Sequence, residues 1–191
     1  MKEMGTGLIP IFWGIVLVDF DYTYDSFSKF SLSPDFVGYS LIVFGLGSLI
    51  SLSRQFAIAR ICAWLLIPVS IILWLYPSTS TVLRPLDWAV IGLDTAMIWT
   101  LLGGINEYGV RRNQLFLTKW SSAYRLAYVG LWFIAMALWI VHSVAPPPPT
   151  NDLGLFFAAG LVIIFLWIYL SLMILDLLYR FKVDLDKQSF S

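Results

Sequence analysis

Residues 153–178 read LGLFFAAGLVIIFLWIYLSLMILDLL, an apolar run whose one charged side chain is Asp176. About 20 apolar helical residues cross a hydrocarbon core about 30 Å thick, so this run is long enough to span a bilayer. The rest of the 191-residue chain is similar, because 59% of it is hydrophobic and only 13% charged. A soluble domain is about 45–50% apolar and about 25% charged. The composition therefore predicts an all-α, polytopic integral membrane protein.

Five more apolar stretches complete a predicted bundle of six transmembrane helices in a single transmembrane domain, residues 1–191. The expected spans are about 5–20, 34–52, 60–76, 85–105, 124–144 and 153–178. The first span follows a charged start, but no small-residue cleavage site follows it. We therefore expect the first span to be retained as a helix and not removed as a signal peptide.

Lys and Arg residues predict the orientation of this bundle. With six spans, two of the twelve cationic side chains, Lys29 and Arg84, fall in loops on the side opposite the termini. Cationic residues concentrate on the cytoplasmic side of membrane proteins, so both termini are expected there. The other ten lie on the side of the termini: Lys2, Arg54, Arg60, Arg111, Arg112, Lys119, Arg125, Arg180, Lys182 and Lys187.

The longest hydrophilic stretch, residues 106–122, is expected to be a cytoplasmic loop. Its sequence, NEYGVRRNQLFLTKWSS, combines Arg111, Arg112 and Lys119 with the aromatic Trp120. A basic segment with apolar side chains binds anionic lipid headgroups, and the same surface could instead dock a membrane or cytoplasmic protein. Both interpretations stay open at this point.

Several acidic residues have a structural explanation. Three stand at the beginning of a span, where the helix dipole favours a negative charge, and two precede an arginine by four residues. These five are Asp35, Asp87, Asp152, Glu107 and Asp176.

Asp19, Asp21 and Asp25 lie at the outer, carboxy-terminal end of the first span, where the helix dipole disfavours negative charge. They predict either an acidic outer vestibule that concentrates or binds cations, or an ordinary solvated acidic loop. The pattern does not decide between the two.

Asp94 lies deepest, nine residues after Pro85 and therefore about 13 Å into the bilayer. An aspartate at the centre of a membrane helix costs about 2.5–3.5 kcal/mol, and we expect no Lys or Arg at comparable depth in another span. Asp94 is thus expected to be protonated, hydrogen-bonded inside the bundle, or facing water or a cation. Asp87 lies on the same helix face, about 10.5 Å away along the axis. The two carboxylates mark either polar packing or stations on an ion or ligand path.

Catalytic signatures are absent from the sequence. The single His142 and the single Cys62 exclude a Cys/His zinc site and an internal disulfide framework. There is no G-x-S-x-G, H-E-x-x-H or phosphate-binding loop motif, so no cofactor is expected. Twelve cationic and twelve acidic residues give a formal net charge of zero, which does not favour nucleic acid.

Two functions remain. The first is a non-catalytic accessory protein or subunit of a larger membrane assembly. The second is a small solute- or cation-binding or transport protein that uses Asp94 and the acidic outer vestibule.

Residues 32–49, LSPDFVGYSLIVFGLGSL, open the second span. Pro34, Asp35, Phe36, Gly38 and Tyr39 form a Pro-Asp-Phe-x-Gly-Tyr segment, and a Gly-Leu pair follows it at residues 45–46. In this segment the chain resembles small uncharacterised bacterial integral membrane proteins. The resemblance implies a multi-pass location in the bacterial cytoplasmic membrane and brings no activity. Size and span number also look like those of substrate-binding components of energy-coupling-factor vitamin transporters, whose Ala-x-x-x-Ala pattern the first span lacks.

Overall fold

The computed structural model describes residues 6–25, 35–75, 84–144 and 153–189, and every regular element in these ranges is a helix. The all-α prediction is therefore confirmed for the described part of the chain. The elements are α1 (Leu8–Asp25), α2 (Asp35–Gly47), α3 (Arg54–Leu75), α4 (Arg84–Arg111), α5 (Leu115–Val144) and α6 (Leu153–Ser189).

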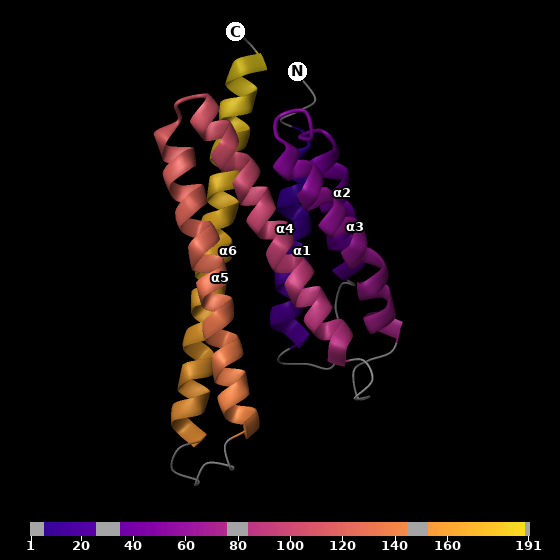
Figure 1. The fold of residues 1–191 in the computed structure, drawn as a ribbon, viewed down its shortest axis with the longest axis vertical. Helices are drawn as coiled ribbons and strands as arrows, with labels where there is room; N and C mark the ends of the chain where they lie inside the picture. The colour runs from indigo at the N-terminus through magenta and orange to yellow at the C-terminus, as the bar shows by residue number, and fades with distance from the viewer. Residues whose placement is uncertain (1–5, 26–34, 76–83, 145–152, 190–191) are drawn as a thin grey trace.

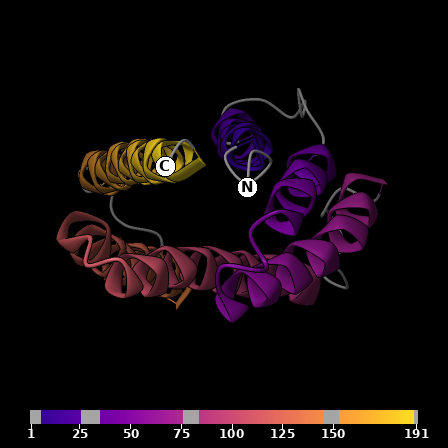
Figure 2. The same cartoon turned by 90° about the horizontal axis from the view of Figure 1, so that it is seen from above.

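Consecutive helices pack side by side along the chain, and α6 returns to contact α1. Seen from above, α2 to α5 form an arc and α1 and α6 lie across from it (Figure 2). Helix α1 begins and α6 ends at the same end of the bundle, which also holds the turns at residues 48–53 and 112–114 (Figure 1). We call this the basic end, because helix ends here carry Arg54, Arg111, Arg112, Lys182 and Lys187.

Three described helices are long and apolar enough to cross a membrane, not the six that were expected. They are Arg54–Leu75, Trp88–Arg111 and Gly160–Lys187. The shorter apolar helices are Leu8–Val18 and Asp35–Gly47. The 13 residues of α2 rise about 20 Å, less than the hydrocarbon thickness of about 30 Å.

The second helix is short because the chain tightens after Gly45. The amides of Ser48 and Leu49 donate to the carbonyls of Gly45 and Leu46, three residues back, at 3.2 and 3.0 Å. Such bonds tighten a helix end, and the turn then leads into α3. The prediction of a helix to residue 52 is therefore wrong, since apolar residues fill the turn as well as the helix.

The predicted cytoplasmic loop at residues 106–122 is mostly helical. Helix α4 continues to Arg111 and α5 begins at Leu115, so the connection is a three-residue turn. Asn113 adopts a left-handed φ of 53°, which asparagine tolerates better than most residues. The Gln114 amide closes the turn by donating to the Gly109 carbonyl at 2.8 Å. Apolarity alone located the spans and missed polar residues that extend both helices.

Helices α1 and α2 approach through glycines. A Cβ atom at Gly14 would lie 2.6 Å from the carbonyl oxygen of Gly38, and one at Gly45 would lie 2.3 Å from the oxygen of Gly7. Both distances are shorter than any real Cβ contact, so side chains at these positions would push the two helices apart. Small residues bring membrane helices together in this way.

Candidate functional site

Asp94 lies in the middle of α4 and is partly buried. The Tyr128 hydroxyl of α5 donates a hydrogen bond of 2.7 Å to its Oδ2 atom. The Tyr39 hydroxyl of α2 donates a longer bond of 3.4 Å to Oδ1. Both tyrosines are buried, with 5% of the surface of Tyr128 and 2% of that of Tyr39 exposed. One carboxylate therefore joins three helices, and of the three alternatives expected for Asp94 the structure shows hydrogen bonds inside the bundle.

A small cavity of about 20 Å³ adjoins the carboxylate. A cavity needs about 10–15 Å³ of such volume to hold one water molecule, so this one has room for about one. Apart from Asp94, the polar side chains that line it are Tyr128 and Ser171. The lining residues come from five helices, α1, α2, α4, α5 and α6. The other lining residues are apolar: Ile15, Val18, Ile42, Met97, Ile98 and Ile174.

Among the residues that the structure describes, no cationic side chain forms an ion pair with Asp94. The ion pairs among the described residues join Arg111 to Glu107, Arg180 to Asp176 and Lys182 to Asp186. Two phenol groups are thus the hydrogen-bond donors to Asp94 in the described part of the chain. The site combines a carboxylate, two phenols, the Ser171 hydroxyl and space for one water in otherwise apolar surroundings.

The expectation that no Lys or Arg lies at the depth of Asp94 stays a prediction, and Arg125 is the cationic residue that bears on it. Arg125 precedes Tyr128 by three residues, about 4.5 Å along the axis of α5, and it lies ten residues into that helix. Its guanidinium nevertheless turns away from Asp94, because its Cζ atom lies 4.0 Å from the centroid of the Trp99 ring, toward the basic end. Long cationic side chains reach along a helix toward water in this way. The fifth predicted span begins at residue 124, so Arg125 was expected at its edge, whereas α5 begins at Leu115.

The outer carboxylates are only partly described. Asp19, Asp21 and Asp25 lie in α1, which continues to Asp25, so their backbone is helical and not a loop. Asp87 lies in the first turns of α4. The side chains of these four residues lie outside the described part of the chain, and so does the predicted acidic vestibule.

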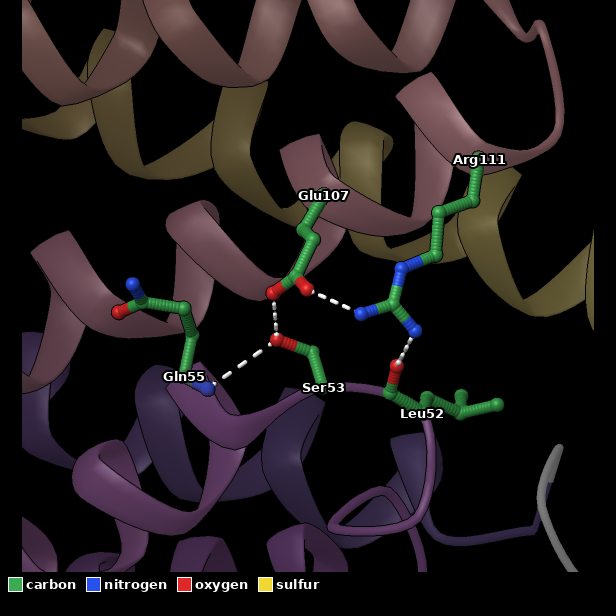
Figure 3. Close-up of polar contacts among 5 residues, drawn as sticks. All are labelled: Leu52, Ser53, Gln55, Glu107 and Arg111. Atoms are coloured by element: carbon green, nitrogen blue, oxygen red, sulfur yellow. Dashed lines mark hydrogen bonds and ion pairs between the residues drawn. The ribbon is translucent and has the colours of Figure 1, made fainter.

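Arg111 has a structural role at the basic end (Figure 3). It forms an ion pair with Glu107, as its spacing predicts, and its Nη1 atom donates to the Leu52 carbonyl at 3.3 Å. Glu107 also accepts a hydrogen bond from the Ser53 hydroxyl. That hydroxyl in turn caps α3 by accepting from the Gln55 amide at 3.1 Å. The network fastens the α2–α3 turn to α4.

The other predicted docking residues, Arg112, Lys119 and Trp120, are exposed. Trp120 lies between Phe116 and Tyr124 along α5, with ring centroids 6.0 and 5.6 Å apart. Between the start of α5 and the end of α6 lies a groove of about 470 Å³. The side chains that line it include Gln114, Phe116, Asp176, Arg180, Asp184 and Lys187.

No protein-family model matches the chain, and no curated protein or solved structure is significantly similar to it. Among the described residues, no three His, Cys, Asp or Glu side chains gather as metal ligands. Inferences about function therefore start from the geometry around Asp94 and at the basic end.

Proposed function

We propose that this chain is a six-span membrane protein whose central carboxylate, Asp94, binds and releases a proton. Both termini lie on the cytoplasmic side in this proposal, and the membrane is the cytoplasmic membrane of a bacterium. Three apolar helices of sufficient length support membrane insertion, and the cationic residues at the basic end support the orientation. Helices α1, α2 and α5 would cross beside them.

The observation that carries this proposal is the isolation of the Asp94 carboxylate beside a cavity for one water. An ionised aspartate at the centre of a membrane helix costs about 2.5–3.5 kcal/mol, and a proton removes that charge. The cavity of about 20 Å³ has no space for a vitamin-sized solute. Intramembrane carboxyl groups of this kind serve proton and ion pathways.

The two tyrosines make the two carboxylate oxygens unequal. Oδ2 is held by the short bond from Tyr128, whereas Oδ1 accepts the longer bond from Tyr39. Oδ1 is therefore the oxygen that takes a proton relayed from solvent by a water in the cavity, which receives one proton as it passes another on. Ser171 lines the same cavity, and its hydroxyl can donate to and accept from that water.

Proton movement through the purified protein in liposomes tests the proposal, with an internal pH-sensitive dye and an imposed potassium diffusion potential. We expect wild-type vesicles to change internal pH and Asp94→Asn vesicles to match empty ones. Asp176→Asn is the matched control, because Asp176 is exposed, pairs with Arg180 and does not line the cavity. Equal flux in wild-type and Asp94→Asn vesicles would contradict the proposal.

A second function, docking to a larger membrane assembly, is favoured by the exposed side chains around the α4–α5 turn. Leu115 is 84% exposed and Val110 is 59% exposed, next to the exposed cation Arg112. Apolar groups beside a cation at a helical hairpin suit a protein partner. Purification in mild detergent tests this function. A partner in fixed ratio should accompany the wild type and be lost from Leu115→Asp, and its absence from the wild type would refute docking.

A further inference from the structure

Arg125, Trp99 and Gln55 converge on one side of α4. A Cβ atom at Gly103 would lie 3.4 Å from the Nη2 atom of Arg125 and 3.5 Å from the Oε1 atom of Gln55. The guanidinium of α5 and the amide of α3 therefore flank the same glycine. Trp99, one turn earlier in α4, lies under the guanidinium.

Arg125 has no carboxylate partner in the described part of the chain. Its Nε atom is buried without a hydrogen bond, and none of the ion pairs among the described residues includes it. The Gln55 side-chain amide points away from the Glu107–Arg111 pair (Figure 3). Arg125 as a whole is partly buried. A cation withdrawn from water is costly unless it is paired and hydrogen-bonded, so the guanidinium favours an anion beside it.

The depth of the guanidinium identifies the anion. Gly103 follows Asp94 by nine residues, which places it about 13.5 Å toward the basic end. Gln55 is the second residue of α3, whose 22 residues rise about 33 Å, close to the hydrocarbon thickness. The guanidinium thus lies where hydrocarbon meets headgroups, the region that tryptophan side chains also favour.

We propose that Arg125 and Gln55 bind the phosphate group of an anionic phospholipid in the leaflet at the basic end. The guanidinium would donate two parallel hydrogen bonds to phosphate oxygens, and the Gln55 amide nitrogen would donate a third. Trp99 holds the guanidinium plane by stacking. This site rests on the membrane placement proposed above and is independent of proton binding at Asp94.

Native mass spectrometry of the full chain, released from nanodiscs of phosphatidylglycerol and phosphatidylcholine, tests the site. We expect wild type to retain phosphatidylglycerol about tenfold more strongly than phosphatidylcholine, because the choline ammonium of the latter offsets the phosphate charge that the guanidinium would pair with. Arg125→Gln should lose this preference. Lys187→Gln, which removes an exposed cation at the end of α6, should keep it. Arg125→Lys retains the charge and should show an intermediate preference, and it serves as the test if Arg125→Gln does not fold.

The site would be overturned if Arg125→Gln retained phosphatidylglycerol as strongly as wild type does. If only Arg125→Lys folds, unchanged retention in that variant would overturn the site. Titration with inorganic phosphate separates a lipid headgroup from free phosphate, and displacement of the lipid at equal affinity would overturn the lipid assignment. Asp94→Asn should retain the lipid as wild type does. Loss of proton flux with lipid retention intact therefore separates failure at Asp94 from failure at Arg125.

Discussion

Replacing Tyr128 by phenylalanine removes one hydroxyl from the centre of the bundle and leaves the aromatic ring in place. The ring packs against Trp167 at a centroid distance of 5.0 Å, so the packing is largely preserved. The lost interaction is the 2.7 Å hydrogen bond to Asp94. Hydrogen bonds between membrane helices average about 0.6 kcal/mol, whereas a bond to an ionised group contributes about 1.5–3 kcal/mol.

The expected loss of unfolding free energy therefore depends on the protonation of Asp94. It should be about 0.6 kcal/mol at low pH, where the carboxyl is neutral, and at least about 1.5 kcal/mol at high pH, where it is ionised. The bond strengthens on ionisation because a charged acceptor attracts the phenol proton more strongly. Tyr39→Phe should lose less than Tyr128→Phe, since its bond is longer at 3.4 Å.

Equilibrium unfolding in mixed micelles measures this effect as a double-mutant cycle of Tyr128→Phe and Asp94→Asn at low and high pH. The cycle isolates the coupling free energy between the two side chains. The reasoning requires a coupling that grows as pH rises. A coupling near zero, or one that is the same at both pH values, would refute the assigned hydrogen bond and the titration of Asp94.

Three other predictions concern the scaffold and use the same unfolding assay. Gly45→Ala should destabilise the bundle by about 1–3 kcal/mol, because the new Cβ atom collides with the Gly7 carbonyl and overpacks the α1–α2 contact; wild-type stability would contradict that contact. Glu107→Gln should lower the unfolding free energy by about 1–3 kcal/mol, since Ser53 and Arg111 both lose a charged acceptor; an unchanged unfolding free energy would show that the network does not fasten the turn. Asn113→Gly should be neutral and Asn113→Val should cost about 1–2 kcal/mol, because only the latter is strained at a φ of 53°; equal stabilities would refute the left-handed turn.

Composition and the lengths of the apolar stretches were sufficient for the helical class and the order of the six helices. Two predictions at the basic end were wrong for the same physical reason: the helix to residue 52 and the loop at residues 106–122. Leu49 and Leu52 are apolar but lie in a turn, while residues 106–111 and 118–122 are mostly polar but helical. Hydropathy measures the transfer of side chains from water to an apolar phase. It contains no information on the backbone hydrogen bonds that end or extend a helix.

Asp94 could be predicted as the central polar residue, because an acidic side chain deep in an apolar run needs an explanation. Its partners could not. The chain contains nine tyrosines, and nothing in the sequence shows which phenols turn toward Asp94. Tyr39 was named only as part of the Pro-Asp-Phe-x-Gly-Tyr segment, and no sequence pattern pointed to Tyr128. The proposed Arg125 site could not be predicted, because its residues come from three helices whose relative register the sequence does not fix.

Infrared difference spectroscopy of the chain in lipid, recorded between low and high pH, tests proton binding by Asp94 most directly. The geometry predicts a carbonyl-stretch band of a protonated carboxyl that disappears at high pH in the wild type. The same band should be missing from Asp94→Asn and shifted in Tyr128→Phe, because one of its hydrogen bonds is lost. A titrating band that is identical in wild type and Asp94→Asn would contradict the claim.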